Sequence, residues 1–403
     1  MQLSLITGLY SVQSFGSGMV STCIPMYATA IGLPESVGLI VALPSMAALF
    51  VNLPGGVVVD IFGRKRPLIV GALMTGFGTL WMAVSGGIAS VIGNRLLIGA
   101  GFSIWSTAMD ACQGDTVSRL GQHKGRALGY MSTASSISYT VGPLIAGALV
   151  TGGGVMLPLA MAGISTLLTV PLIRCLNDTS PAASQTSAAR TNDYAAGPAT
   201  PSLPTSSWRK SVRHYQELLQ DPDQQAVLVS QLVLQVSMSA HMTIVPLYAI
   251  ATYAATPLQV GSLISVIGFT GFFGAPLGGW MADRVGRRPT ILISASACGA
   301  AFLVIPCVDT HAALLAALAV AGLSDAMLGT ASAALVIDVT PANRRGIQSA
   351  LSSQVGDMAY TIAPIVLTAV ATMISYNAAF ASASSLVGAG VYYFARRRGG
   401  PTQ

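Results

Sequence analysis

The sequence predicts an all-α polytopic membrane protein, with twelve transmembrane helices in two pseudo-symmetric six-helix halves. The first observation is composition: of 403 residues, 52% are hydrophobic and only 8% are charged. Soluble domains carry roughly 25% charged residues, so this chain has too few to cover a large water-facing surface. The second observation is length, because a spanning helix needs about 20 apolar residues and twelve would use about 240. The third is an internal repeat that relates the two halves of the chain.

Twelve stretches have the length and hydropathy of membrane spans. They are residues 3–31, 36–59, 67–87, 89–114, 124–151, 153–176, 224–251, 257–281, 289–308, 311–337, 345–372 and 375–395. Residues 177–207, between the sixth and seventh, are rich in Ser, Thr, Ala and Pro, which is typical of a flexible linker. Trp208, Val212, Tyr215 and Leu219 then recur every three or four residues, which predicts a short amphipathic helix at the membrane surface.

Four units follow from this division of the chain. They are an N-terminal six-helix bundle (1–176), a cytoplasmic linker with the amphipathic helix (177–223), a C-terminal six-helix bundle (224–395) and a basic cytoplasmic tail (396–403).

The placement of the basic residues predicts the topology. Nineteen of the 20 lysines and arginines fall in even-numbered loops or in the tail, and the twentieth, Arg95, lies inside the fourth span. By the positive-inside rule both termini are cytoplasmic. The same asymmetry explains the net charge of +6 through topology and contact with anionic lipid, so no nucleic-acid partner is expected. We expect a multi-pass protein embedded in the lipid bilayer of the plasma (cell inner) membrane.

The two halves repeat one another at two constant offsets. The pairs Gly38/Gly261, Asp60/Asp283, Gly63/Gly286, Gly99/Gly322 and Asp115/Asp338 are all 223 residues apart. The run from Tyr139 to Pro143 matches the run from Tyr360 to Pro364 at an offset of 221. The change of two residues falls where loops are expected. Six plus six matched helices are the architecture of one large class of secondary transporters, whose substrate site lies near the midplane between the halves.

The sharpest local signal is GGVVVDIFGRKRP at Gly55 to Pro67, which is echoed by GGWMADRVGRRP at Gly278 to Pro289. Each copy has a glycine at a helix end, an acid four residues later and a basic cluster after a turn glycine. The glycines allow close helix approach and a tight turn. The acids can pair with arginine or cap the N-terminus of a neighbouring helix. The alternative is that these residues only set the topology.

These two motifs resemble the loop 2–3 and loop 8–9 signature of the major facilitator superfamily. The first copy has Ile61 where the signature usually carries a basic residue, whereas the second has Arg284 and fits fully. In that family the segment gates the cytoplasmic side, so the resemblance implies gating roles for Asp60, Arg64, Asp283 and Arg287. With their neighbours and repeat partners, the gating candidates are Asp60, Gly63, Arg64, Asp115, Gly142, Pro143, Asp283, Gly286, Arg287 and Asp338.

Two further stretches extend the resemblance over nearly the whole chain. The run from Arg95 to Gly101 (RLLIGAG) resembles the RxxxGxG element, whose arginine is associated with proton coupling in the family. The fifth span resembles the motif of the proton-driven antiporters around its Gly142-Pro143, with Ser138 and Ala146 replacing two glycines. The branch that the chain is most like is therefore that of the drug:proton antiporters.

Ionisable side chains inside the predicted spans are the candidate functional residues, because each costs about 2.5–3.5 kcal/mol on insertion scales. The candidates for substrate binding or proton coupling are Arg95, Asp110, Asp325, Asp357 and His241, together with the neutral Gln231 and Gln235. A carboxylate in low dielectric can gain and lose a proton at usable pH, which is what proton coupling requires. By resemblance, helices 1, 4, 7 and 10 line the cavity, which adds Ser14, Ser17 and Ser21.

Structural roles stay open for each of these residues. Arg95 and Asp110 are fifteen residues apart on one helix, about 22 Å, so the partner of Arg95 must come from another helix. Asp110 and Asp115 approach the cytoplasmic end, where they can pair with loop arginines. Asp325 and Asp357 can be buried carboxylates held by a hydroxyl or an amide, and His241 a packed neutral histidine.

Other chemistries find no support in the sequence. The five cysteines have no CxxC or Cys/His spacing, so no metal is expected. No P-loop, GxSxG elbow, HExxH or dinucleotide fingerprint occurs, so we expect neither an enzyme, nor a cofactor, nor direct use of ATP.

The sequence thus predicts a monomeric secondary transporter that works by alternating access. We expect proton-coupled antiport of a small organic substrate out of the cytoplasm, and a cation as cargo, since the intramembrane acids outnumber Arg95. A proton symporter or uniporter for uptake of a sugar, organic acid or other metabolite is the alternative. A transport-inactive sensor on the same fold is a third possibility.

Overall fold

The computed structural model describes residues 2–118, 124–176, 220–340 and 345–396, and only the backbone of residues 53–58, 60, 61, 118, 124–128, 345–347, 349 and 350. The regular structure of these residues is entirely helical. The helices are α1 (Gln2–Ala30), α2 (Val37–Phe62), α3 (Lys65–Val84), α4 (Ile88–Ser118), α5 (Lys124–Gly153), α6 (Met156–Arg174), α9 (Pro222–Met242), α10 (Ile244–Tyr253), α11 (Pro257–Arg284), α12 (Arg287–Val304), α13 (His311–Val339), α14 (Arg345–Met373) and α15 (Tyr376–Arg396), with the short 3-10 helices η1 (Pro34–Ser36) and η3 (Ile305–Cys307). The predicted amphipathic helix at 208–219 and the tail beyond Arg396 lie outside the described residues.

The all-α fold class and the twelve predicted helices are confirmed, with one local difference. The seventh span, expected as one helix over 224–251, is divided at Thr243 into α9 and α10. Pro246 favours the division, because proline lacks the amide hydrogen that would bond to the carbonyl four residues earlier, and its ring crowds that carbonyl. It is not sufficient by itself, since α1 continues through the repeat-related Pro25.

Within the part of the chain that the structure describes, eleven helical stretches are long and apolar enough to cross a membrane, and α9 with α10 counts as one of them. Helix α1 is not among them, although its 29 residues are long enough. Its sequence carries Gln13, Ser14, Ser17 and Ser21 at helical spacing. A helix with one polar face reads as less hydrophobic than one that faces lipid all round.

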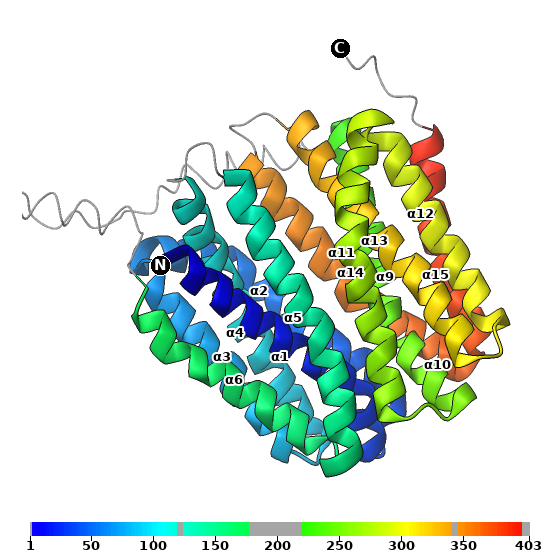
Figure 1. Cartoon of the computed structure of the whole chain (residues 1–403), viewed down its shortest axis with the longest axis horizontal. Helices are drawn as coiled ribbons and strands as arrows, with labels where there is room; N and C mark the ends of the chain where they lie inside the picture. The colour runs from blue at the N-terminus through cyan, green and yellow to red at the C-terminus, as the bar shows by residue number, and fades with distance from the viewer. Residues whose placement is uncertain (1, 119–123, 177–219, 341–344, 397–403) are drawn as a thin grey trace, which may run out of the picture.

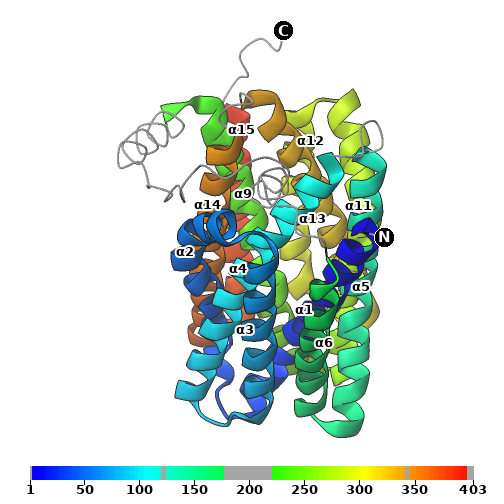
Figure 2. The same cartoon turned by 90° about the vertical axis from the view of Figure 1, so that its left-hand side faces the viewer.

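The helices form two groups, α1–α6 and α9–α15, and each group makes six spans when α9 and α10 are counted as one. Figure 1 shows α1–α6 on one side and α9–α15 on the other. Within the first group α1 packs on α5 and α6, and α3 packs on α4 and α6; within the second, α13 packs on α11 and α12. The groups meet along two helix pairs, α5 with α11 and α2 with α14. Figure 2, turned by 90°, shows the helices running side by side through the height of the molecule.

The chain's turns define two ends of the molecule. The turns at Gly63 and Gly286, the end of α6 and the start of α9 lie at one end, which we call the linker end; the turns at 31–36, 85–87 and 254–256 lie at the opposite end. The described contacts between the groups concentrate toward the opposite end. There Gly261 of α11 meets the carbonyl of Pro143 in α5, and the Ser265 hydroxyl donates to the Thr140 carbonyl at 2.6 Å.

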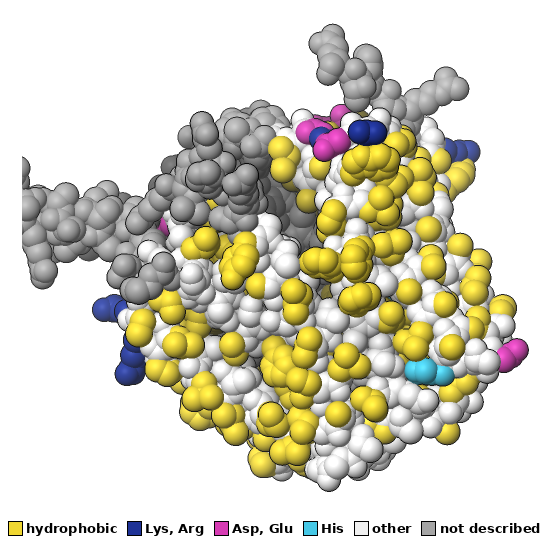
Figure 3. Space-filling view, in the orientation of Figure 1, with side chains coloured by type: hydrophobic (Ala, Val, Ile, Leu, Met, Phe, Trp, Pro, Cys, Tyr) yellow, Lys and Arg dark blue, Asp and Glu magenta, His cyan; other side chains and the backbone are white. Residues whose placement is uncertain are grey.

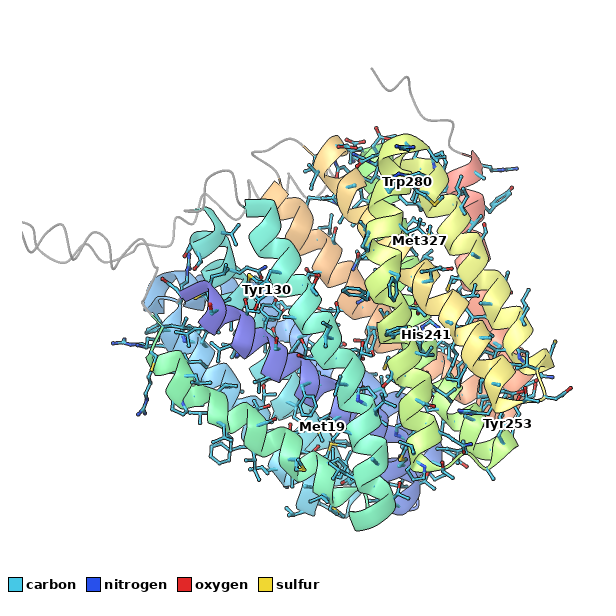
Figure 4. The ribbon with its side chains drawn as sticks, in the orientation of Figure 1. Met19, Tyr130, His241, Tyr253, Trp280 and Met327 are labelled. Atoms are coloured by element: carbon cyan, nitrogen blue, oxygen red, sulfur yellow. The ribbon has the colours of Figure 1, made fainter. Side chains whose placement is uncertain are left out.

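On the face that Figure 3 shows, apolar side chains are spread over both groups, and the charged side chains lie near its edges. Phe50, Phe77, Leu168 and Met358 are among the exposed apolar residues. At the linker end of α11 the Arg284 guanidinium stacks 5.0 Å from the ring centre of Trp280, which Figure 4 labels. An aromatic ring beside a long cationic side chain is typical of the membrane–water interface.

Candidate functional site

Two adjoining cavities lie among the helices that the two groups bring together. The first, of about 260 Å³, is lined mainly by α1, α2, α3 and α4, and we call it the N-side cavity. The second, of about 470 Å³, lies between α1 and α5 on one side and α9, α11 and α13 on the other, and we call it the C-side cavity. Both cavities have Tyr139 and Met242 in their walls, and the Tyr139 hydroxyl donates to the Met242 Sδ at 3.7 Å.

A third cavity continues the C-side cavity toward the linker end. It has a volume of about 330 Å³ and shares Ser135 and Ser136 with the C-side cavity, while Tyr10 and Gln113 line its other walls. The three spaces together run from the linker end through the middle of the molecule, and the N-side cavity reaches Ile24, Val41 and Arg95 in the half nearer the opposite end. The close glycine contacts of α5 with α11 and of α2 with α14 lie at that opposite end.

Arg95 is the only residue among the wall residues of the N-side cavity that carries a full charge at neutral pH. Its side chain is 5% exposed, and its Nε donates to the backbone carbonyl of Ile40 in α2 at 2.8 Å. Within the described residues no carboxylate forms an ion pair with it. The sequence had required a partner from another helix, and the structure provides a carbonyl dipole on α2.

Neutral polar groups share the N-side cavity with Arg95. Gln13 and Thr75 are each about nineteen-twentieths buried, and Tyr139 and Tyr360 reach the wall from the fifth and eleventh spans. The Thr75 Oγ1 atom is buried and makes no hydrogen bond within the described residues. A buried hydroxyl without a partner is unusual in a folded protein.

Asp325 lies at the centre of a buried polar cluster in the second group. The Ser237 hydroxyl lies 2.8 Å from Oδ1 and 2.9 Å from Oδ2 and donates to the carboxylate, and the Cys298 thiol donates to Oδ1 at 3.3 Å. His241, labelled in Figure 4, places its Nδ1 3.1 Å from Oδ2, at ion-pairing distance, although neither ring nitrogen makes a well-aligned hydrogen bond. The His241 ring also packs on Phe302, with ring centres 5.1 Å apart. Asp325 forms part of the wall of the C-side cavity.

Asp357 links the two groups. The Asn52 amide of α2 donates to its Oδ2 at 2.6 Å, and the Ser103 hydroxyl of α4 donates to the Asn52 carbonyl oxygen. A hydrogen-bonded chain therefore runs from α4 through α2 to α14. The repeat-related positions, Ser136 and Ala275, instead face each other across the C-side cavity.

Three other predicted site residues have different surroundings. The Asp110 Oδ1 accepts a hydrogen bond from the Tyr10 hydroxyl at 2.7 Å, so its partner is α1 and not a loop arginine. Gln231 and Gln235 lie against Gly356 of α14. A different face of α9, which carries Leu234 and Met238, lines the C-side cavity.

The gating candidates form matching ion pairs in the two halves. The Arg64 Nε lies 3.3 Å from the Asp115 Oδ2, and at the repeat-related positions the Arg287 Nε lies 3.0 Å from the Asp338 Oδ2. Arg287 also pairs with Asp283. These residues sit at the linker end, where they tie the α2–α3 turn to α4 and the α11–α12 turn to α13.

Four glycine and proline candidates have a geometric role. Gly63 and Gly286 both have positive φ angles, 79° and 109°, directly before the paired arginines. Gly142 lies against the Phe15 carbonyl of α1, and Pro143 against Gly261 of α11. The side chain of Asp60 lies outside the described residues.

Several wall residues were not among the sequence candidates. Gln13, Thr75, Tyr139 and Tyr360 are neutral, and hydroxyls and amides are common enough in spans that none stands out singly. Ser237 had a usable signal, since it precedes His241 by four residues and so shares its helix face. Among the described residues no group of three or more His, Cys, Asp or Glu side chains is placed to hold a metal ion.

Comparison with known proteins connects this architecture to transporters. The chain is 27% identical over 158 residues to multidrug resistance protein 2 of Bacillus subtilis (strain 168), a match that covers 39% of each chain. It is 24% identical over 156 residues to an uncharacterised MFS-type transporter of Methanocaldococcus jannaschii, covering 38% of this chain and 39% of that one. The matches thus span well under half the length of either curated relative.

Two solved structures share the fold over almost the whole chain. A crystal structure of a mutant of the nucleoside transporter NupG superposes with a TM-score of 0.81 at 12% identity, covering 98% of this chain and 99% of that one. A POT family transporter in complex with 5-aminolevulinic acid superposes with a TM-score of 0.75 at 12% identity, covering 97% and 94%. At such identities the likeness concerns the fold.

The decisive match is to the family as a whole. A family model described as Major Facilitator Superfamily matches residues 6–252 and 227–403, nearly the full chain. The family match identifies the protein as a multi-pass integral membrane transporter and not an enzyme. The two groups of six helices, and the transporter structures that superpose on them, agree with this fold. The chain belongs to the Major Facilitator Superfamily.

Proposed function

We propose that this transporter exports a small organic compound in exchange for protons, by alternating access. The observation that carries the proposal is the Asp325 cluster, a carboxylate 2% exposed that nevertheless forms part of the wall of the C-side cavity. An ionisable group inside a membrane span is retained at considerable cost, and proton relays are among its common uses.

The chemistry of the cluster suits reversible protonation. With Asp325 charged, Ser237 and Cys298 donate to its oxygens and His241 lies beside it. A proton that enters from the cavity can rest on the carboxylate or on the imidazole, because the two are 3.1 Å apart. In either arrangement the protonated pair of Asp325 and His241 has no net charge. This limits the desolvation cost of keeping the pair buried while the transporter changes the side to which the site opens.

The interface between the groups suits a rocking motion of residues 1–176 against 224–395. The groups meet mainly along two helix pairs, α5 with α11 and α2 with α14, at glycines where backbones touch. We propose that the linker end is cytoplasmic, as the basic residues predict, so the described cavities face the cytoplasm. We propose a monomer as the working unit.

The comparisons support two directions of transport. The name of the Bacillus subtilis relative, a multidrug resistance protein, favours export of an organic compound. The nucleoside transporter with the same fold, and the polar residues around Arg95 in the N-side cavity, favour the alternative of proton symport or uniport of a metabolite.

The test is substrate-triggered proton movement in acid-loaded inside-out vesicles. Cationic drugs, sugars and organic acids are added in turn, and a pH-sensitive dye reports the lumen. We expect one class of compound to trigger proton efflux, and Asp325→Asn and Asp357→Asn each to abolish it. Asp309→Asn, which removes an exposed carboxylate from the turn before α13, serves as the matched control and keeps the signal.

Other outcomes identify the alternatives. Proton movement in the same direction as the compound contradicts export and indicates a symporter. Compound flux with no proton movement indicates a uniporter. Binding of a compound without any flux indicates a sensor.

A further inference from the structure

We propose that the N-side cavity binds the anionic group of its substrate, so that the transported compound is a small organic anion with an apolar body. The inference rests on the proposed transport function and specifies its cargo. It reverses the expectation of a cation, which came from counting charges in the sequence without knowing their partners.

The acids that outnumber Arg95 are already occupied by the protein. Asp110 accepts from Tyr10, Asp357 accepts from Asn52, and Asp325 accepts from Ser237 and Cys298 beside His241. Each carboxylate therefore has a partner on another helix. A cationic substrate would have to displace one of these contacts before it gained its own.

Arg95 is in the opposite situation. A guanidinium has five N–H donors, and the described contact of this one is a single bond from Nε to the Ile40 carbonyl. It is 5% exposed and faces a cavity with no other charged wall residue. A buried cation that has no carboxylate partner is costly, and an anion that enters the cavity removes that cost.

A second observation marks the same cavity as a ligand site. The Thr75 Oγ1 is buried, the residue is 6% exposed, and the hydroxyl makes no hydrogen bond within the described residues. Thr75 and Arg95 both line the N-side cavity. The Oγ1 lies against Gly101 of α4, and a turn of the Thr75 side chain brings it toward the cavity. A carboxylate there can then accept from the guanidinium and from the hydroxyl, which satisfies both groups at once.

The remaining wall residues of the N-side cavity indicate the size and polarity of the rest of the substrate. Val20, Ile24, Val41, Ile98 and Phe102 are apolar and line the same space. The volume, about 260 Å³, is slightly below the roughly 300–1,000 Å³ of typical ligand pockets, so the fit favours a small compound. A carboxylate on a ring or a short hydrocarbon chain has the required size and polarity.

The internal repeat explains why this space exists in one half. The repeat partners of Gly16, Val20, Thr75 and Phe102 are Ser237, His241, Cys298 and Asp325. All four first-half residues belong to or adjoin the N-side cavity, whereas the four second-half residues fill the equivalent volume with their own contacts. One half thus holds a polar cluster, and the other has at the equivalent place a cavity with Arg95 as its charged wall residue.

The test compares three probes of nearly equal shape on the purified full chain in detergent, without any ion gradient. They are benzoate, neutral benzamide and cationic benzylamine, and binding is measured by calorimetry and by the shift in thermal unfolding. We expect benzoate to bind at least about tenfold more tightly than the other two, since only it can form charge-assisted hydrogen bonds with Arg95. Arg95→Gln is expected to remove this preference, and Thr75→Val to weaken benzoate binding about threefold or more while keeping the side-chain shape.

Arg396→Gln is the matched control, because it also removes one arginine charge but from the linker-end tip of α15, where Arg396 stacks on Tyr392. It is expected to leave benzoate binding unchanged. If Arg95→Gln does not fold, Arg95→Lys and Thr75→Val take its place, and both must weaken benzoate binding. Benzoate binding no tighter than benzamide or benzylamine, or unaffected by these variants, overturns the proposal. Because no gradient is present, a lack of proton flux in vesicles leaves the binding result intact, and the two proposals fail separately.

Discussion

At the scale of single residues, the carboxylates inside the spans are each held by a side chain from a different helix. Asp110 on α4 is held by Tyr10 on α1, Asp325 on α13 by Ser237 on α9, and Asp357 on α14 by Asn52 on α2. In a hydrocarbon environment such a bond serves two purposes, because it satisfies the acid and it fixes the approach of two helices. These acids therefore have a structural role, beside the transport role that we propose for Asp325 and Asp357.

This arrangement makes Ser237 important for stability. Its hydroxyl is fully buried and contacts both oxygens of Asp325. Ser237→Ala leaves a buried carboxylate short of a donor, so we expect the free energy of unfolding in detergent to fall by about 1–3 kcal/mol. Ser230→Ala is the matched control on the same helix, since the Ser230 hydroxyl is also buried but donates only to the Val227 carbonyl of its own helix. An equal loss in both variants would show that the bond to Asp325 is not the cause.

Sequence reasoning reached these residues individually but not as a cluster. Asp325 and His241 were candidates because an ionisable group in an apolar span is conspicuous. Their contact was beyond reach, because 84 residues separate them and it depends on how α9 packs on α13. Neutral residues such as Ser237 and Thr75 carry no charge that would make them conspicuous in the sequence. The expectation of a cationic cargo came from the number of acids, because the partners of those acids cannot be predicted from composition.

At the scale of elements, the two signature turns share a backbone conformation that only glycine adopts readily. Gly63 has φ 79° and ψ −179°, and Gly286 has φ 109° and ψ 156°. Each ends a helix and redirects the chain so that the next arginine faces the neighbouring helix. The turn conformation therefore positions the arginine for its ion pair, and the same arrangement occurs in both halves.

Alanine at either turn is expected to destabilise the protein. A Cβ in this region of φ and ψ costs about 1–3 kcal/mol, so Gly63→Ala and Gly286→Ala should each lower the thermal unfolding midpoint in detergent. Gly388→Ala is the control, because Gly388 is helical, has open space around it and gains helix propensity from alanine. Midpoints unchanged at both turns would show that the chain reaches the same geometry without glycine.

The two ion pairs at these turns differ in burial, which predicts unequal strengths. The side chains of Arg64 and Asp115 are 10% and 29% exposed, against 28% and 50% for Arg287 and Asp338. Exposed pairs contribute about 0–1 kcal/mol, whereas hydrogen bonds between less exposed charges contribute about 1.5–3 kcal/mol. We expect Arg64→Gln to lower the free energy of unfolding more than Arg287→Gln does. Double-mutant cycles with Asp115→Asn and Asp338→Asn measure each pair, and a larger coupling at Arg287 contradicts the argument.

Hydropathy was a good guide to the elements because a spanning helix has only one way to satisfy its backbone in lipid. The predicted ends of most helices agree with the structure to within a few residues. The division at Thr243 was missed because Pro25 and Pro246 occupy repeat-related positions, yet α1 continues through its proline and the seventh span does not. Sequence alone gives the same proline to both helices, and the packing around each decides the outcome.

At the scale of the whole molecule, the contacts that join the two groups obey the internal two-fold repeat. Gly38 of α2 lies against Pro364 of α14, and Gly261 of α11 lies against Pro143 of α5. Both glycines are related by the offset of 223, and both prolines by the offset of 221. A symmetric pair of close contacts at the opposite end, with cavities toward the linker end, is the arrangement that a rocking transporter needs in one of its two states.

This arrangement predicts that one methyl group shifts the balance between the two states. A Cβ added at Gly38 would overlap the Pro364 carbonyl and lie 2.7 Å from the Thr368 Oγ1, and backbone at this contact cannot yield without the helices separating. Gly38→Ala therefore penalises only the state in which the opposite end is closed, and an alanine that disfavours one state raises the population of the other. Glu35→Cys and Asp309→Cys place one spin label in each group, at exposed positions of the opposite end. Pulsed electron–electron double resonance then measures the distance between the two labels.

The exposed Cys175 and Cys307 are first replaced by serine, while Cys23, Cys112 and Cys298 are buried and stay in place. We expect Gly38→Ala to increase the fraction of long distances between the labels, and Gly261→Ala to do the same because it meets the repeat-related contact. Gly8→Ala, at a glycine with open space around it, is the control and leaves the distribution unchanged. If neither interface variant lengthens the distance, the glycine contacts are not what holds the opposite end closed, and the rocking interface must be sought along the Asn52 to Asp357 bond instead.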